Sequence, residues 1–278
     1  MALNERMSDR ENEVSKPRFN ATVPNIARVY DYWLGGKDHF AADRAEAERL
    51  LGIYPRLAQL ARENRLFLAR AVTWLAAQGI AQFLDIGSGL PTAHNTHQVA
   101  QAVNPASRVV YADNDPLVVA HASALLSGPG VEAIRADLAD PAGIIADPVV
   151  GQLIRPGEPA GLILAMVLHF FDAEAASKIT AALADWLAPG SYVVISVGLG
   201  DERTGLTLAR EYRAGTVHNH APDQVAGFFD GLDLVPPGLV DARDWNPGVS
   251  VPSAGHRGGR ILAGVGRKPH PAAAVDRM

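Results

Sequence analysis

A glycine-rich segment directly after an apolar run is the part of the chain with the clearest capacity for binding chemistry. Gln82–Ile86 has the pattern of a short strand, and Gly87, Ser88 and Gly89 follow it. Glycines let a backbone turn sharply and let a ligand approach closely, and the start of a following helix offers unpaired N–H groups. Asp85, two residues before the first glycine, suits a cationic ligand better than a pyrophosphate. The segment predicts a cofactor site, although an ordinary strand-to-helix turn would need the same two glycines.

The spacing of these glycines distinguishes two classes of cofactor. A dinucleotide fingerprint needs a third glycine three residues after the second, and this chain has Thr92 there, after Leu90 and Pro91. The proline stands where it can begin the next helix. NAD(P)-dependent oxidoreduction is therefore an alternative that the missing glycine and the place of Asp85 count against.

Polar residues follow the second predicted strand, Arg108–Ala112, at the end where a parallel sheet binds its ligand. Asp113 is in line with the strand, and a carboxylate there can accept both hydroxyls of a ribose; Asn114 is next to it. Asp115 is better explained as the cap of a helix that begins at Pro116. Asp113 thus indicates adenosine without indicating a reaction, and a second capping aspartate is the alternative.

The third predicted strand, Val131–Arg135, also ends at an acid. Asp137, followed by Leu138, could accept a hydrogen bond from an adenine amino group. A turn aspartate ahead of a helix at Asp140 explains it equally well, so both interpretations stay open at this point.

Histidine and cysteine content limits metal and thiol chemistry. His218 and His220 are two residues apart, but no acid stands at ligand spacing and the chain has no cysteine. A zinc site of the usual kinds is therefore not expected, and a thiol nucleophile is excluded. We predict no metal.

Alternating elements must position these residues. Further apolar runs at Gly161–Val167, Tyr192–Val197, 232–235 and 260–265 bring the strand candidates to seven, and helical patterns follow each of the first four. This alternation is typical of a doubly wound α/β sheet. Ahead of it, residues 20–78 show helical periodicity.

Composition bounds the class of protein. The 278 residues are 48% hydrophobic and carry a formal net charge of -5, so we expect no nucleic-acid partner. The first 20 residues have charges but no apolar signal segment, and the longest apolar run, Ala160–Leu168, is too short to span a bilayer. We expect a cytoplasmic protein with no membrane partner; the sequence leaves its oligomeric state open.

From about residue 80 to 268 the chain resembles the class I S-adenosylmethionine methyltransferases. The resemblance rests on Leu84–Gly89, Tyr111–Asp113, Ala136–Leu138 and the turn into the fifth strand at Pro189–Ser196. It implies an α/β fold: a Rossmann-like, seven-stranded, mostly parallel sheet with an antiparallel last strand, plus an N-terminal helical lid. Leu90 and the proline after it depart from the small residue that many class I enzymes keep.

A closer resemblance covers nearly the whole chain. Pro24–Asp38, Glu63–Leu68 and Phe228–Leu232 look like a bacterial, largely actinobacterial, family of S-adenosyl methyltransferases whose substrates are not established. It implies S-adenosyl-L-methionine as the cofactor and leaves the acceptor open. The expected organisation is a tail at 1–20, a helical cap at 21–79, a Rossmann-like domain at 80–268 and a tail at 269–278.

The resemblance also implies roles for individual residues. Two lid residues are candidates: the ring of Tyr32 could pack on adenine or on a sulfonium, and the amide of Asn64, on the apolar face of its helix, must meet either a neighbouring backbone or the ligand. The implied cofactor-binding set is Asp85, Gly87, Ser88, Gly89, Asp113, Asn114, Asp137, Leu138, Met166, Tyr32 and Asn64.

His169 is the candidate catalytic residue. It follows the fourth strand, where class I enzymes meet the methyl group, and histidine titrates near neutrality. A locally packed histidine is the alternative. The expected function is methyl transfer to a small-molecule acceptor; a protein that binds S-adenosylmethionine or S-adenosylhomocysteine without turnover is the second hypothesis, and the oxidoreductase is the third.

Overall fold

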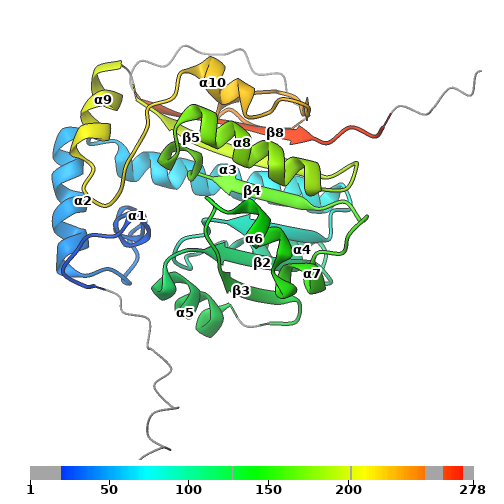
Figure 1. Cartoon of the computed structure of the whole chain (residues 1–278). Helices are drawn as coiled ribbons and strands as arrows, with labels where there is room; N and C mark the ends of the chain where they lie inside the picture. Colours follow the sequence, from blue (N-terminus) through cyan, green and yellow to red (C-terminus); the bar gives the residue numbers. More distant parts are fainter. Residues whose placement is uncertain (1–19, 127, 201, 248–258, 272–278) are drawn as a thin grey trace, which may run out of the picture.

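Alternating strands and helices build one sheet with helices on both faces (Figure 1). The computed structural model describes residues 20–126, 128–200, 202–247 and 259–271. The strands are β1 (Gln82–Ile86), β2 (Arg108–Asp113), β3 (Val131–Arg135), β4 (Gly161–Ala165), β5 (Tyr192–Leu199), β6 (Asp233–Leu234), β7 (Val240–Asp241) and β8 (Arg260–Arg267).

The strand order is β3-β2-β1-β4-β5-β8-β6, and β7 also pairs with β8. The neighbours from β3 to β5 run parallel, whereas β8 is antiparallel to β5. This topology confirms the predicted α/β class with its antiparallel last strand. The described part of the chain has eight strands rather than seven, because Val240 and Asp241 form a two-residue ladder that is too short to leave a periodic pattern in the sequence.

The two faces of the sheet bury two hydrophobic cores. Leu84 and Ile86 of β1 point into one core, and Phe83 points into the other, as the alternation along a strand requires. The helices of the first core are α6 (Pro141–Ala146), α7 (Pro148–Leu153), α8 (Ala173–Trp186) and α10 (Pro222–Gly227); those of the second are α3 (Leu57–Ala77), α4 (Thr96–Val103) and α5 (Pro116–Leu125).

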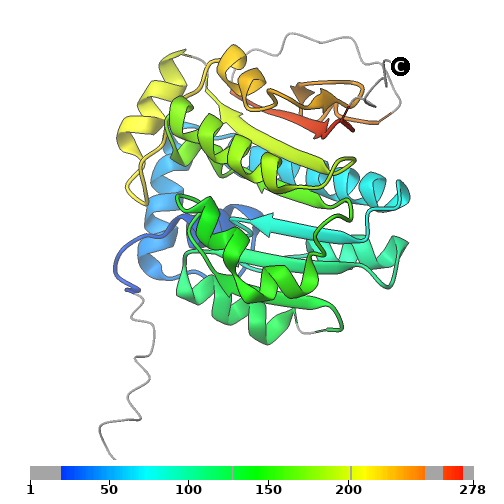
Figure 2. The same ribbon diagram turned by 45° about the vertical axis from the view of Figure 1, so that its right-hand side comes forward.

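The N-terminal helices form the predicted cap at the carboxyl ends of the parallel strands. In Figures 1 and 2, α1 (Ile26–Leu34) and α2 (Ala41–Ile53) stand at the end toward which the parallel strands point, and α9 (Glu202–Glu211) lies beside α2. Val29, Trp33, Ala47, Leu50 and Ala61 give this cap a small core of its own. The cap therefore covers the edge where ligands bind in such sheets.

Two local predictions need correction or comment. Pro91 does not begin the helix after the glycine segment. Instead α4 begins at Thr96, because Oε1 of Gln98 accepts the N–H of Asn95 and Oδ1 of Asn95 accepts the N–H of Thr92.

The predicted tails lie outside the described residues except for Asn20 and residues 269–271. Asp115 caps α5 as predicted, and Asp172 caps α8.

No helix in the described residues combines the length and the apolar character that crossing a membrane requires.

Candidate functional site

A cavity of about 190 Å³ opens at the carboxyl ends of β1, β2 and β4; we call it the strand-end cavity. It contains the strand ends predicted to bind a cofactor, together with Asn25 and the first two residues of α1. Its lining is Asn25, Ile26, Ala27, Ile86, Gly87, Gly89, Asp113, Asn114, Asp115, Ala136, Asp137, Leu138, Met166, Val167, Phe170 and Phe171.

Gly87 and Gly89 are each explained by a different structural requirement. Both have positive φ, 70° for Gly87 and 66° for Gly89, which glycine adopts without steric cost. A Cβ at Gly87 would overlap Cγ1 of Val167, so the β4 loop needs this glycine for close packing. A Cβ at Gly89 would meet no atom within 4 Å, so this glycine leaves open space in the cavity wall.

The Asp113 carboxylate ties the glycine turn to the end of β2. Its Oδ2 accepts the N–H of Gly89 at 3.0 Å, and its Oδ1 accepts the N–H of Asp115 at 3.0 Å. Burial raises the pKa of this carboxyl, and the backbone N–H groups lower it in part. Each oxygen keeps a second lone pair, so Asp113 can still accept hydrogen bonds from a ligand.

Asp137 is a turn residue that also belongs to the lining of the strand-end cavity. Its Oδ1 accepts the N–H of Ala139 at 2.9 Å, as a turn aspartate does, and its side chain belongs to the cavity lining with the buried Leu138. The helix that follows is capped by Asp140, whose Oδ1 accepts the N–H of Gly143.

Asp85 lies beneath the glycine turn and is not part of the cavity lining. It is 5% exposed, and Oγ1 of Thr96 donates a 2.6 Å hydrogen bond to its Oδ2. Burial raises the pKa of the Asp85 carboxyl to about 6, while Thr96 and the nearby Arg65 oppose the rise. Ser88 is half-buried next to the turn, and its N–H reaches Ala112 O at 3.4 Å.

A second cavity, of about 120 Å³, lies between the cap and the sheet; we call it the cap cavity. Its wall is mainly aromatic and aliphatic, and the described lining residues include no lysine, arginine or carboxylate. They are Ile26, Tyr30, Trp33, Tyr54, Leu57, Leu60, Ala61, Met166, His169, Phe170, Gly198, Leu199, Gly200, Gly205, Leu208, Tyr212, Val217, His218 and Asn219. The strand-end and cap cavities share Ile26, Met166 and Phe170.

His169 lies in the wall of the cap cavity, in the short 3-10 turn η1 (Leu168–Phe170) after β4. Burial lowers the pKa of its imidazole to about 3, and His220 and His218 add to the effect. Its Nδ1 is buried and has no hydrogen-bond partner among the described residues. A neutral ring with an unpaired nitrogen can take a proton from a bound acceptor.

Met166 stands at the junction of the two cavities in a conformation that side chains rarely adopt. Its φ is 58°, in the left-handed region, which costs a non-glycine residue about 1–2 kcal/mol. The O and Oγ of Ser196 both accept its N–H, at 2.9 and 3.1 Å. Such backbone strain is typical of functional positions.

Asn64 connects Met166 to the cap. Its Oδ1 accepts a 2.7 Å hydrogen bond from the Ser196 hydroxyl, and its Nδ2 donates to the Tyr30 hydroxyl at 3.0 Å. The predicted partners of this buried amide were a backbone or a ligand, and in the structure they are two side chains. Tyr30 and Ser196 lie in segments that carry the family resemblance, but the sequence did not predict them as the partners of Asn64.

Tyr32 lies apart from both cavities. Its hydroxyl donates to Glu48 at 2.9 Å, and its ring packs edge-on against His39. In the described structure Tyr30, two residues earlier, is the tyrosine of α1 that lines a cavity.

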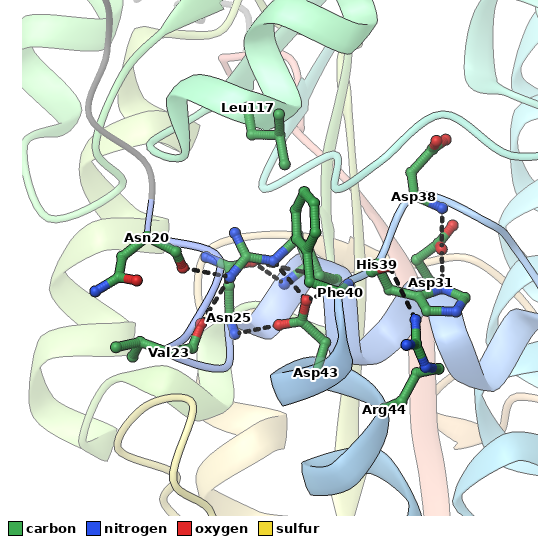
Figure 3. A network of polar contacts seen from close by, with 12 residues as sticks. Asn20, Val23, Asn25, Asp31, Asp38, His39, Phe40, Asp43, Arg44 and Leu117 are labelled. Atoms are coloured by element: carbon green, nitrogen blue, oxygen red, sulfur yellow. Dashed lines mark hydrogen bonds and ion pairs between the residues drawn. The ribbon is translucent and has the colours of Figure 1, made fainter.

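A buried ion pair holds the segment that covers the strand-end cavity. Arg28 Nε lies 2.8 Å from Asp43 Oδ2, and its Nη2 donates to the carbonyls of Val23 and Asn20. Figure 3 shows the same carboxylate receiving the Asn25 N–H, with Phe40 pointing toward Leu117 of α5. No sequence pattern links residues 15 apart in this way, so this network was not predicted.

No group of three or more metal-ligating side chains comes together within the described residues. The rings of His218 and His220 stack with centroids 6.4 Å apart.

Comparison with known proteins now identifies the family. The family described as S-adenosyl methyltransferase matches residues 12–269. A solved candidate methyltransferase from Thermobifida fusca YX is 40% identical, with a TM-score of 0.83 over 90% of this chain and 96% of its own. A DUF574 family protein from Streptomyces avermitilis MA-4680 is 34% identical, with a TM-score of 0.83 over 91% of this chain and all of its own, 100%. No curated protein matches the chain.

These similarities favour methyl transfer over the oxidoreductase and over binding without turnover. The chain belongs to the S-adenosyl methyltransferase family and is a methyltransferase that uses S-adenosyl-L-methionine.

Proposed function

We propose that this enzyme methylates a small, neutral and largely apolar acceptor that binds in the cap cavity. The observation that carries the proposal is that the two cavities are adjacent, because Ile26, Met166 and Phe170 line both of them. A cofactor in the strand-end cavity and an acceptor in the cap cavity would meet at these residues. Methyl transfer needs such a direct approach of the two reactants, because positioning supplies much of the catalysis.

The residues at the strand ends fit the cofactor. Gly89 leaves open space where a side chain would project, and Asp113 keeps lone pairs for the ribose hydroxyls. When bound, S-adenosyl-L-methionine supplies an electrophilic methyl group on a sulfonium. The proposed binding set is Asp85, Gly87, Ser88, Gly89, Asp113, Asn114, Asp137, Leu138 and Met166, with Asn64 acting through Tyr30 and Ser196. Tyr32 stays outside this set because its hydroxyl is bound to Glu48.

The proposed role of His169 is that of general base. Its half-buried, neutral ring has a buried, unpaired Nδ1 beside the cap cavity. His169 would take the proton of the acceptor's oxygen or nitrogen as that atom bonds to the methyl carbon, while the bond from this carbon to the sulfonium sulfur breaks and a neutral thioether leaves. The low pKa of His169 makes the imidazolium unstable in the closed site, so the proton must then leave to solvent.

The chemistry of the wall supports a neutral acceptor. Phosphate and carboxylate groups would need a cation, and the described lining of the cap cavity offers no lysine or arginine. The cavity wall favours an acceptor with a planar or aliphatic skeleton, because it contains the aromatic rings of Tyr30, Trp33, Phe170 and Tyr212.

Calorimetry with the cofactor and a screen of acceptors test this proposal. We expect S-adenosyl-L-methionine to bind the wild type, Asp113→Ala to lose binding, and NAD to give no heat. A screen of neutral phenols, alcohols and amines with labelled cofactor should then yield methylated product. Val217→Trp should abolish transfer while keeping cofactor affinity, and the matched Val217→Ala should keep both. Normal turnover by the tryptophan variant would place the acceptor elsewhere.

We also propose that the enzyme works in the bacterial cytoplasm without a nucleic-acid partner. The two similar solved proteins are of bacterial origin, and the net charge of -5 opposes binding to phosphate backbones. The test is whether the purified enzyme retards DNA or RNA in a gel at low salt, which we expect it not to do.

A further inference from the structure

We propose that Asn64 is a positioning residue for methyl transfer, which fixes the conformation of Met166 through hydrogen bonds that begin at Tyr30 in the cap. The inference deepens the proposed function and rests on it, because Met166 lines both the strand-end cavity and the cap cavity. It gives the cap a part in the transfer step in addition to covering the sheet edge.

The side chain of Met166 is part of the boundary between the two cavities. Gly198 of β5 lines the cap cavity, and a Cβ at that position would lie 3.2 Å from Cε of Met166 and 3.9 Å from its Sδ. The thioether therefore packs over the glycine, where a larger side chain would displace it. A cofactor and an acceptor that react at this boundary both contact Met166, so its conformation affects how the reacting atoms align.

Met166 needs support from its neighbours to keep its backbone conformation. Its φ of 58° is unfavourable for a residue with a Cβ. Its N–H donates to O and Oγ of Ser196, at 2.9 and 3.1 Å. Ser196 is completely buried, so its hydroxyl needs partners inside the protein. The position of this hydroxyl decides how well it supports Met166.

The hydrogens in this chain of contacts can be assigned in one direction only. The Ser196 hydroxyl accepts the Met166 N–H and donates its own hydrogen to Oδ1 of Asn64 at 2.7 Å. Nδ2 of Asn64 then faces the Tyr30 hydroxyl at 3.0 Å, and this hydroxyl donates to the carbonyl of Ala61 at 3.1 Å. A flipped amide would leave the Ser196 hydrogen without its acceptor. Asn64 is therefore needed as an acceptor on one side and as a donor on the other.

The reach of the hydrogen bonds argues against a purely local role for Asn64. Attaching α1 to α3 would need only the hydrogen bond from Tyr30 to Ala61. The buried Asn64 adds two further links, which extend to β5 and from there to the residue after β4. Buried hydrogen bonds in series strengthen one another, and loss of one member leaves its neighbours unpaired. We therefore expect a change at Tyr30 to reach Met166.

Methyl NMR of methionine in the ligand-free full chain tests the assignment. The chain has four methionines, and Met166 is the one among the described residues. The signal of its ¹³C-labelled methyl group is assigned by its loss in Met166→Leu. We expect Asn64→Leu, Ser196→Ala and Tyr30→Phe each to shift this signal or to split it into two. Tyr30→Phe is the most direct test, because it removes only an oxygen atom and keeps the ring.

Two variants that remove a hydroxyl elsewhere are the controls. Tyr54→Phe removes the hydroxyl of another tyrosine in the wall of the cap cavity, which donates to the carbonyl of Gly259 at 2.9 Å. Thr180→Val removes a buried hydroxyl from α8, which donates to the carbonyl of Ala176 at 2.9 Å. Both should leave the Met166 signal in place, even where they lower the melting temperature.

Kinetics with an acceptor from the screen separate positioning from binding. In Asn64→Leu, kcat should fall by about 10- to 100-fold, because a displacement of about 1 Å at the reacting atoms has an effect of this size. The KM for the cofactor, and its affinity by calorimetry, should change less than about fivefold, as expected when an interaction of the transition state is lost.

An unchanged Met166 signal in Asn64→Leu and Tyr30→Phe would overturn the inference, since the hydrogen bonds would then only attach α1 to α3. Equal movement of the signal in the two controls would overturn it as well. Tyr30→Phe carries the test if Asn64→Leu does not fold. Failure of the proposed function is distinguishable, because the signal would still move in the variants while S-adenosyl-L-methionine would leave it unchanged in the wild type.

Discussion

Asp85 is a buried acid that works against the stability of the ligand-free protein. Its carboxyl has a pKa of about 6, raised mainly by burial from an ordinary value near 4. The folded state thus holds a proton on Asp85 more tightly than the unfolded state does, so the contribution of Asp85 to stability is most favourable below about pH 4 and is lost as pH rises through 6. A cationic ligand group beside Asp85 would remove this cost.

The first prediction follows from this pH dependence of the Asp85 contribution. Asp85→Asn should raise the melting temperature at pH 7.5 by several degrees, corresponding to about 1–3 kcal/mol, and have little effect near pH 4. The same variant should weaken binding of S-adenosyl-L-methionine at pH 7.5. Calorimetric melts across pH 4–8 measure the first effect, and Thr96→Val, which removes the donor to this carboxylate, should lower stability most at high pH. A lower melting temperature for Asp85→Asn at every pH would contradict the argument.

The contribution of His169 to stability depends on pH in the opposite direction to that of Asp85. Burial lowers the pKa of its imidazole to about 3, so the folded state excludes a proton that the unfolded state binds below about pH 6.5. The contribution to stability is present above that pH and is lost as pH falls toward 3.

The second prediction is that His169 stays neutral down to about pH 4 in the ligand-free enzyme. Long-range ¹H–¹⁵N NMR of the imidazoles, with His169→Gln for assignment, should show a neutral ring at pH 5. The exposed His94 is the internal reference within the same spectrum. A titration of His169 near pH 6.5 would mean that water reaches the ring, and the proposed dry base would be wrong.

The sequence predicted the residues at the strand ends better than it predicted the hydrogen-bond partners of buried polar side chains. The glycines and the strand-end acids stand in line with short apolar runs, so their position at the sheet edge follows from the sequence. Asn64 was recognised as buried and in need of partners, yet Tyr30 and Ser196 lie 34 and 132 residues away from it along the chain. Nothing in a single sequence marks such distant polar pairs.

At the scale of the element, the glycine turn and the β4 loop pack as one unit. Gly87 lies against Val167, whereas Gly89 faces open space in the strand-end cavity. The same substitution at these two positions should therefore separate packing from binding.

The third prediction uses this pair. Gly87→Ala should destabilise the fold by about 2–4 kcal/mol, because its Cβ would overlap Val167 in addition to the cost of positive φ. Gly89→Ala should cost only about 1–2 kcal/mol but weaken cofactor binding, because its methyl group would project into the cavity. Denaturant unfolding and calorimetry on the two variants measure both quantities, and equal stability losses with unchanged cofactor affinity would refute the assignment of Gly89.

The fourth prediction concerns residues 20–27, which lead into the first turn of α1. Arg28→Met removes the cation from Asp43, which is fully buried, and should cost about 3–5 kcal/mol within the cap. Because Asn25, Ile26 and Ala27 line the strand-end cavity, cofactor affinity should fall as well. Hydrogen exchange should speed up in residues 25–34 and much less in the central strands. Arg44→Met, at an exposed position in α2, is the control and should leave both readouts unchanged.

Long, periodic elements were predictable and very short ones were not. The first five strands were placed to within a few residues because each has apolar residues in a short run bounded by turn residues, although β3 also has the exposed Glu132 and Arg135. The start of α4 was wrong by several residues, since side-chain contacts of Asn95 and Gln98 decided it rather than Pro91. β7 pairs only two residues and depends on β8 to exist.

At the scale of the whole molecule, the cap and the sheet share one of the two hydrophobic cores. α3 belongs to the segment assigned to the cap, yet Leu60, Phe67, Leu68, Val72 and Leu75 are buried in the same core as the strands β1, β2, β4 and β5. The boundary between residues 79 and 80 therefore remains a prediction about sequence organisation, and the packing argues against independent folding on its two sides.

The last prediction tests that interdependence with two truncations. A fragment from residue 80 to 278 lacks α3 and loses the burial of these five side chains, worth about 10 kcal/mol at about 2 kcal/mol each. That loss is as large as the whole stability of a typical domain, so this fragment should not unfold cooperatively and should bind a hydrophobic dye. A fragment from residue 55 to 278 keeps α3 and should show a cooperative, lowered melting transition. Near-ultraviolet circular dichroism and calorimetry distinguish the two, and a cooperative transition in the shorter fragment would mean that the sheet folds without α3.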